Sequence, residues 1–185
     1  MAHISAGVEY GLHCLLYLAP STDGAVRSAS TRDLAELQGL SVEFIAKLFT
    51  RLEKAGLVRA TEGIRGGFQL ARPADAITVL DVIGAVDGEK PLFDCREIRG
   101  RCAVFGDAPP AWSQRGVCSI HAVMLEAEQR MREFLRAQTL GAIAARLAAK
   151  APPDFGPSVA GWLDARVAAR GAHRNTESTL KGNPS

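Results

Sequence analysis

Residues 31–70 read TRDLAELQGLSVEFIAKLFTRLEKAGLVRATEGIRGGFQL and contain the clearest local structural signals in the chain. Thr31 is placed to cap a short helix that ends at Gly39. Ser41 is placed to cap a second helix, in which apolar residues recur at helical spacing up to Gly56. Two short helices separated by a tight glycine turn match the helix-turn-helix pattern, in which the second helix carries polar residues on its outer face.

A β-hairpin is predicted directly after these helices. Residues 57–60 and 67–70 have the composition of short strands, and residues 61–66, TEGIRG, join them. A glycine-bearing loop between two strands indicates a hairpin, and beside a helix-turn-helix such a hairpin is a wing. The sequence therefore predicts a mainly α-helical protein with a small β-hairpin wing.

Two amphipathic helices are expected on either side of this module, over residues 4–19 and 75–86. Pro20 ends the first of them. Their apolar positions are Val8, Leu12, Leu15, Leu16 and Ala19 in the first helix, and Ile77, Leu80, Val82 and Ile83 in the second. Each helix can therefore bury one face against a core.

The chain changes character from residue 87 to residue 116, where helical periodicity gives way to glycine, proline and charge. A loop of this length usually has a function. A long helix is then predicted over residues 119–137, with apolar residues at alternating spacings of four and three: Ile120, Met124, Ala127, Met131 and Phe134. This seam is typical of a coiled coil and predicts a dimerisation helix. The alternative is a core helix packed within one subunit.

These observations predict three segments. They are a winged helix-turn-helix DNA-binding domain over residues 1–73, a loop and dimerisation helix over 74–150, and a C-terminal extension over 151–185. The extension has a weakly amphipathic stretch around 159–167 and a polar end from Gly171 that we expect to be partly disordered.

Composition is that of an ordinary soluble globular protein, since 47% of the 185 residues are hydrophobic and 23% are charged. The net charge of +2 decides little, but residues 27–72 hold eight basic and five acidic residues, a local excess that can face phosphates. The apolar run of residues 10–19 is too short to span a bilayer, and no cationic leader or cleavage site surrounds it. We therefore expect a cytoplasmic protein that does not enter membranes.

The chain resembles a known family over about residues 3–148. The strings that carry the resemblance are LAELQGLSVEFIAKLFTRLEKAGLV, EGIRGGFQLARP, ITVLDVIGAVDG, the cysteine stretch and a long helix ending in QTLGAI, residues 138–143. They are similar to those of the winged helix-turn-helix iron–sulfur regulators that include IscR, NsrR and RsrR. The resemblance implies a homodimer that binds a partly palindromic operator in double-stranded DNA, as a repressor whose affinity depends on a bound cluster.

In a winged helix-turn-helix protein, the second helix of the motif is the recognition helix, and its N-terminal half enters the major groove of DNA. The residues expected at base edges are Ser41, Glu43, Phe44 and Lys47. Arg51, one turn further, can reach a base or a phosphate, and Arg65 at the wing tip can enter the minor groove. For the charged residues the alternative is a solvated helix face, and for Phe44 it is a place in the core.

Three cysteines bracket or occupy the irregular stretch, namely Cys95, Cys102 and Cys118, and thiolates are the usual ligands of iron–sulfur clusters. His121 follows Cys118 by three residues and is the first choice for a fourth ligand. This Cys-x-x-His ending resembles the IscR branch and implies a 2Fe-2S cluster in preference to 4Fe-4S. The fifteen residues between Cys102 and Cys118 depart from that branch, which makes Cys102 the least secure ligand.

The string GVEYGLHC resembles the RsrR branch instead, and that resemblance makes Glu9 an alternative ligand. Gln38 stands where that branch has a histidine, so His13 or His121 would have to substitute. Cys14, among leucines of the first helix, is expected to be buried and is left out of the site. The cluster could respond to redox state, to nitric oxide or to iron–sulfur status.

The same residues are compatible with other classes of protein. The same cysteines and His121 could hold a structural zinc ion, or the cysteines could be simple loop thiols of a cluster-free DNA-binding regulator. An enzyme or electron carrier is disfavoured, because the chain has no phosphate loop, no catalytic triad and no second cofactor motif. Visible absorbance would separate a cluster from zinc.

Overall fold

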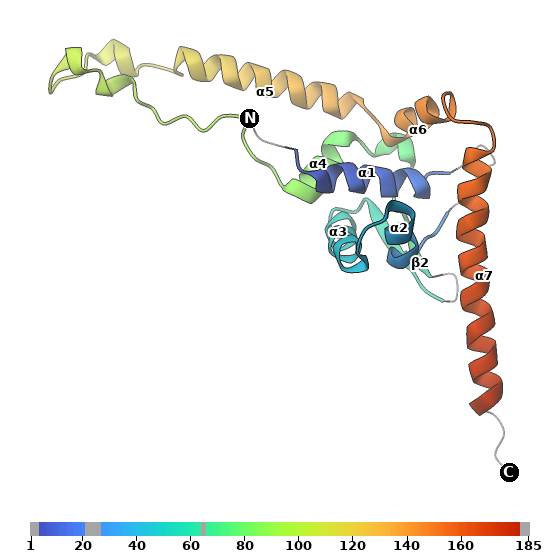
Figure 1. Cartoon of the computed structure of the whole chain (residues 1–185). Coiled ribbons are helices and arrows are strands. Elements are labelled where there is room, and N and C mark those ends of the chain that lie inside the picture. Colours follow the sequence, from blue (N-terminus) through green and yellow to red (C-terminus); the bar gives the residue numbers. More distant parts are fainter. Residues whose placement is uncertain (1–3, 21–26, 64–65, 182–185) are drawn as a thin grey trace.

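The structure, a computed structural model, describes residues 4–20, 27–63 and 66–181, with side chains up to residue 170 (Figure 1). Its helices are α1 (Ala6–Leu18), α2 (Thr31–Gln38), α3 (Val42–Lys54), α4 (Val79–Asp87), α5 (Ser119–Ala137), α6 (Leu140–Ala148) and α7 (Phe155–Lys181). Its strands are β1 (Val58–Thr61) and β2 (Gly67–Leu70). The predicted fold class, mainly helical with a small hairpin, is confirmed.

The helix-turn-helix is formed by α2 and α3. Thr31 was the wrong choice of cap, because Ser30 caps α2: its hydroxyl accepts from the Asp33 amide, and the Asp33 carboxylate accepts from the Ser30 amide. This reciprocal arrangement satisfies two amides that a helix start leaves without partners. Gly39 has a φ of 64°, the left-handed conformation that ends α2 at little cost. Ser41 caps α3 as predicted.

The hairpin pairs β1 with β2 in antiparallel register, from Val58 opposite Leu70 to Thr61 opposite Gly67. It also joins the segment before α2, through a bridge between Ala29 and Phe68. A Cβ atom at Gly67 would come within 2.5 Å of the Ala29 carbonyl oxygen, so the close approach of the two backbones requires glycine there. The wing is therefore anchored to the start of the helix-turn-helix.

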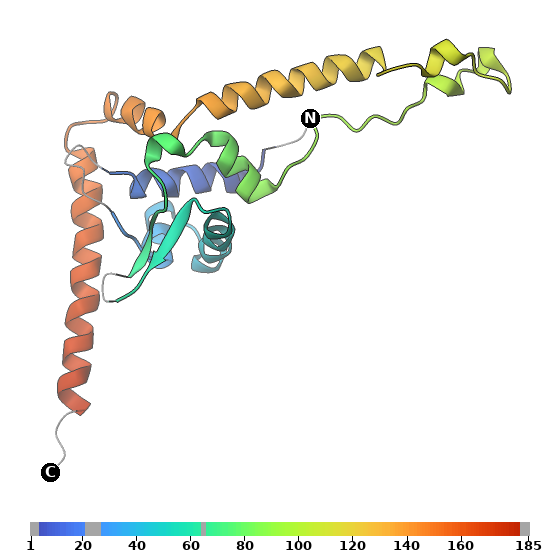
Figure 2. The ribbon, with the colours of Figure 1, turned by 180° about the vertical axis from the view of Figure 1, so that it is seen from behind.

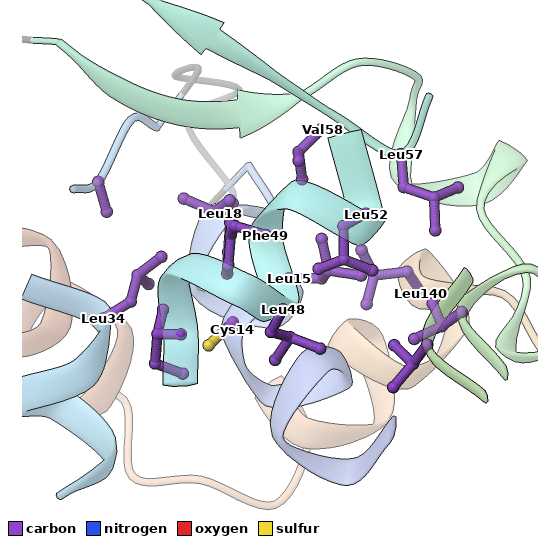
Figure 3. Packing of buried hydrophobic residues seen from close by; sticks show 14 of the residues in the cluster. Cys14, Leu15, Leu18, Leu34, Leu48, Phe49, Leu52, Leu57, Val58 and Leu140 are labelled. Atoms are coloured by element: carbon purple, nitrogen blue, oxygen red, sulfur yellow. The ribbon is translucent and has the colours of Figure 1, made fainter. Parts of the chain in front are cut away.

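One hydrophobic core lies beneath the helix-turn-helix (Figure 3). Leu15, Leu34 and Phe49 from α1, α2 and α3 are fully buried in it. Leu140 of α6 and Leu163 of α7 join the same cluster, so the C-terminal helices complete the core of the N-terminal module. Whether the three predicted segments are separate domains stays a prediction.

The predicted single helix over residues 75–86 is wrong in its first turns. A 3₁₀ turn at Ala74–Ala76 precedes an extended Ile77, and α4 starts only after Thr78, which caps it. The break has a distant cause. Thr78 forms a bridge with Thr139, and the Leu140 amide donates to the Ile77 carbonyl, so this segment pairs with the α5–α6 connection.

The helix predicted over residues 119–137 is confirmed as α5, but it does not continue through QTLGAI. Gln138 is extended and Thr139 caps the separate helix α6, because residues 138–140 take part in the bridge just described. Figures 1 and 2 show α5 projecting from the body with the cysteine-bearing loop at its far end. No residue of α5 is buried in the structure, so the alternative of a core helix does not hold.

The C-terminal extension contains a long helix that was not predicted. This helix, α7, runs through the weakly amphipathic stretch and on to Lys181, and the expected partial disorder of the extension stays a prediction. Its N-terminal half packs on the core through Val159, Trp162 and Leu163. This packing stabilises a helix whose amphipathic pattern is weak.

Candidate DNA interface and cysteine loop

The outer face of α3 is free to meet a ligand. Ile45, Leu48 and Phe49 bury its inner face, while Glu43 and Lys47 are exposed and make no hydrogen bond or ion pair with another described residue. These two charged side chains therefore stand where the sequence placed base contacts.

The N-terminal end of α3 is held by local contacts. The Ser41 hydroxyl accepts a hydrogen bond of 3.2 Å from the Phe44 amide, so its acceptor capacity is used partly for the cap. The Phe44 ring is 40% exposed and meets the Tyr10 ring edge-on, with 5.7 Å between centroids. Phe44 is therefore a surface residue supported by α1, and the alternative of a core position is wrong.

The other two predicted DNA contacts are less simply placed. The Arg51 guanidinium donates a hydrogen bond of 2.8 Å to the Val86 carbonyl, at the end of α4. Its side chain is thus engaged within the protein. Arg65 lies outside the described residues. On β1, Arg59 is exposed, and its guanidinium lies 2.6 Å from the Gln69 amide group, where the amide oxygen accepts. Arg59 was not among the residues predicted from the sequence, where its only distinguishing feature is its position on the first strand of the hairpin.

The four cysteines occupy different environments, and all four are free thiols. Cys14 is completely buried, as predicted, and burial raises its pKa to about 12. Cys95 and Cys118 are half-buried, and Cys102 is exposed. Among the residues that the structure describes, no three His, Cys, Asp or Glu side chains are gathered closely enough to hold a metal ion.

Arg99 organises the loop that carries Cys95 and Cys118. It pairs with Glu97 at 2.5 Å and donates to the carbonyls of Arg115 and Gly116 at 3.2 and 2.9 Å. The Glu97 carboxylate raises the pKa of the Arg99 guanidinium, and Cys118 and Cys95 add to this effect through their charges. Both thiols thus lie within electrostatic reach of one cation, a feature that the sequence analysis missed.

His121, in the first turn of α5, also lies within electrostatic reach of the Glu97–Arg99 pair. Its ring packs against Phe93, with 5.9 Å between centroids, and its charge lowers the pKa of Glu97 after the larger effect of Arg99. Cys102 shares none of these contacts. The structure therefore brings Cys95, Cys118 and His121 to the neighbourhood of the Glu97–Arg99 pair, without closing them around one point.

Two residues of the alternative ligand set lie elsewhere. Glu9 and His13 are exposed on α1, where they line a surface cavity of about 570 Å³ that is otherwise mostly apolar. Gln38, where a histidine was sought, donates through Nε2 to the Tyr10 carbonyl at 3.3 Å and to the Cys14 sulfur at 3.2 Å. In this chain Gln38 therefore fastens α2 to α1.

The structure has an exposed recognition helix after a glycine turn, a buried core behind that helix and an anchored hairpin beside it. Together these features define a winged helix-turn-helix DNA-binding protein. Comparison with known proteins gives the family. The chain belongs to the Rrf2 family, described as iron-dependent transcriptional regulators, which matches residues 4–146.

Three relatives illustrate the match. Protein rrf2 of Nitratidesulfovibrio vulgaris (strain Hildenborough) is 33% identical over 132 residues, which cover 71% of this chain and 80% of that protein. The HTH-type transcriptional regulator IscR of Klebsiella pneumoniae (strain 342) is 36% identical over 109 residues, 59% of this chain and 60% of IscR. The structure of CymR, the global cysteine regulator of B. subtilis, superposes with a TM-score of 0.56 at 24% identity, covering 79% of this chain and 98% of CymR.

The family and these relatives establish the general activity. This chain is a transcriptional regulator and not an enzyme, as the sequence predicted. Within the described ranges, none of the helices has both the length and the apolar character needed to cross a membrane.

Proposed function

We propose that this protein binds operator DNA as a homodimer and represses transcription, with α3 in the major groove and the hairpin at the adjacent minor groove. The observation that carries the proposal is the two-sided character of α3: its inner face is buried, while Glu43 and Lys47 are exposed and have no partner among the described side chains. Lysine can donate to guanine and glutamate can accept from cytosine. A DNA-reading protein works where the DNA is, which in this proposal is the cytoplasm.

The homodimer follows from the apolar face of α5. Ile120 and Phe134 are each 65% exposed and Val123 is 64% exposed. An exposed apolar stripe along a projecting helix suits burial against an identical helix of a second copy. Two recognition helices related by a twofold axis would read a partly palindromic operator.

The finer part of the proposal is a 2Fe-2S cluster in the loop before α5. The donor set fits chemically, since Cys95, Cys118 and His121 supply two thiolates and an imidazole near Arg99. It is incomplete in the protomer, because no three donors are gathered among the described residues. Cys102, or Glu9 of the partner subunit, would have to complete it.

When bound, a cluster supplies a one-electron change of charge or can be lost altogether, so it could report redox state, nitric oxide or iron–sulfur status. The residues of the chain would place the cluster, and so its change of charge, close to α5. The backbone amide of Leu92 donates to the Glu128 carboxylate at 2.9 Å, which ties the loop to α5. A shift of the loop would therefore act on the dimer helix.

A second candidate is a cluster-free or zinc-stabilised regulator. The exposed Cys102 and the absence of a gathered donor set among the described residues favour it. CymR has the same fold and is called a global cysteine regulator, so the fold is not restricted to proteins named for iron.

One experiment separates these proposals. Anaerobically isolated protein would be examined by visible absorbance, iron and acid-labile sulfide content and zinc content. The protein would then be used to select its operator from random duplex DNA, and the selected fragment tested with oxidised, reduced and apo-protein. We expect iron, sulfide and a palindromic sequence. Protein that selects DNA but can be loaded with neither iron nor sulfide keeps the DNA-binding proposal and ends the cluster proposal.

A further inference from the structure

Helix α7 lies beyond the segment that matches the Rrf2 family, which ends at residue 146. Its N-terminal half is nevertheless part of the folded body. Leu163 is 4% exposed within the common core, and Val159 and Trp162 pack against that core. The helix therefore has a fixed position relative to the helix-turn-helix.

Two ion pairs attach α7 to α2, the first helix of the helix-turn-helix. The Arg166 guanidinium pairs with the Glu36 carboxylate and lies over the Trp162 ring, 4.5 Å from its centroid. Arg170 donates to the Asp33 carboxylate at 2.5 Å. Both carboxylates belong to the module expected to approach DNA, where negative charge repels phosphates. The pairing with α7 offsets that repulsion.

The rest of α7 extends past the module it is attached to. In Figure 1 the backbone of its C-terminal half, coloured red, continues beyond α2, α3 and the hairpin, on the side of the body away from α5, and Figure 2 shows the same projection from behind. DNA bound to α3 and the hairpin would lie on this side. In the sequence, arginines recur every four residues at positions 166, 170 and 174, Lys181 follows, and Glu177 is the one acidic residue after 170.

We propose that the C-terminal half of α7 binds the phosphate backbone of DNA beside the sequence read by α3 and the hairpin. This inference rests on the proposed function, because it requires DNA at α3. The N-terminal half of the helix, through Arg166 and Arg170, holds α7 in position, and the projecting half adds contacts. Phosphate contacts carry no sequence information, so α7 strengthens binding to all DNA and lengthens the covered site without changing which sequence is preferred.

The first test neutralises the projecting half in the full-length chain. Binding of Arg174→Gln/Lys181→Gln protein to the selected operator and to a scrambled fragment is measured by fluorescence anisotropy at several salt concentrations. If both residues of each subunit contact phosphates, the variant dimer loses four contacts, and the slope of log K against log salt becomes shallower by about 3.6, since each contact contributes about 0.9. Arg146→Gln/Lys150→Gln, which removes two exposed charges from α6 and its end, is the matched control and should keep the wild-type slope.

An unchanged slope in the α7 variant overturns the proposal, and so does tighter binding, which would make α7 an obstacle to DNA. Neither result affects the proposed function, which depends on whether wild-type protein selects an operator through α3. Failure to select any operator would end both proposals, and it is recognised before the α7 variants are made.

The second test addresses the attachment to α2. The Arg166 and Glu36 side chains are 40% and 49% exposed, so reversing one of them should barely change the stability of the fold. Arg166→Glu places two carboxylates together and should shorten the hydroxyl-radical footprint at its outer ends. The exchange variant Glu36→Arg/Arg166→Glu restores the pair with opposite polarity and should restore the footprint. Footprints of equal length in all three proteins would contradict the proposal.

Discussion

The Arg51 guanidinium donates a hydrogen bond of 2.8 Å to the Val86 carbonyl and so joins the recognition helix α3 to the last turn of α4. Carbonyls in a last helical turn have no partner within their own helix, so Arg51 satisfies one that would otherwise depend on water. The contact connects the DNA-reading helix to the segment that leads into the cysteine loop. A residue expected to touch DNA thus has a structural role in the protomer.

Arg51→Met should lower the free energy of unfolding by about 1 kcal/mol, because it keeps the length of the side chain but removes the donors. Urea unfolding followed by circular dichroism measures the change. Lys54→Met, an exposed change in the same last turn of α3, is the control and should leave the midpoint unchanged. If Arg51→Met instead keeps full stability and loses operator affinity, the hydrogen bond to Val86 is not its main role.

Lys47→Ala should weaken operator binding by about 1–3 kcal/mol while leaving the stability of the protein unchanged, because Lys47 is exposed and pairs with no other residue that the structure describes. A gel-shift titration against the selected operator measures the loss. Lys54→Ala removes the same charge from the other end of α3 and should have a smaller effect. Equal losses for the two variants would mean that Lys47 acts only through general charge.

A charge on the apolar face of α5 should dissociate the proposed dimer. Phe134→Arg places a cation at a position that is 65% exposed in the protomer, so the monomer should still fold while the interface is lost. Light scattering after size-exclusion chromatography should give about half the wild-type mass, and operator affinity should fall with it. Gln129→Arg places the same charge on the opposite side of α5, where Gln129 is exposed, and should remain dimeric. A Phe134→Arg protein that stays dimeric would place the interface elsewhere.

Local patterns in the sequence were sufficient for the helix-turn-helix, the hairpin and α5, because helical spacing and caps depend on residues a few positions apart. Even the error at Thr31 was local. Ser30 is followed three residues later by Asp33, and this spacing is the signature of the reciprocal cap that the structure contains.

Contacts between distant residues could not be predicted in this way. The Thr78–Thr139 bridge divides the predicted helix over 75–86, and Arg170 meets Asp33 across 137 positions of the chain. The candidate site shows the same limit. The cysteines could be recognised as donors, but their separation in sequence does not determine whether a loop brings them together, and nothing local marks Arg99 as the cation beside Cys95 and Cys118.

Asp33 should make the fold sensitive to acid. Burial alone would raise its pKa, but the hydrogen bonds from Ser30 and Arg170 and the charge of Arg170 together hold the pKa below its usual value. The folded state therefore favours the carboxylate. Its stabilising effect is fully present above the unfolded-state pKa of about 3.9 and is lost as pH falls through the lower folded-state pKa.

Arg170→Gln should accordingly lower the free energy of unfolding by about 1–2 kcal/mol at pH 7. This difference from wild type should become smaller below about pH 4. Urea unfolding at a series of pH values measures it. Arg130→Gln, which breaks an exposed pair with Glu126, should change little at any pH. If the difference in free energy of unfolding between Arg170→Gln and wild type stays constant down to pH 3, protonation of Asp33 does not control it.

The thiols should differ sharply in reactivity. Alkylation requires the thiolate, and burial raises the pKa of Cys14 to about 12, whereas Cys102 is exposed and Cys95 and Cys118 are half-buried. Folded apo-protein treated with iodoacetamide at pH 8 should therefore gain three labels by mass spectrometry, and a fourth, on Cys14, only in denaturant. Labelling of Cys14 in the folded protein at the rate of the loop cysteines would contradict its burial. The same reaction, done on anaerobically isolated protein that contains iron, should spare the cysteines that bind it, so peptide mapping decides directly whether Cys102 is a ligand.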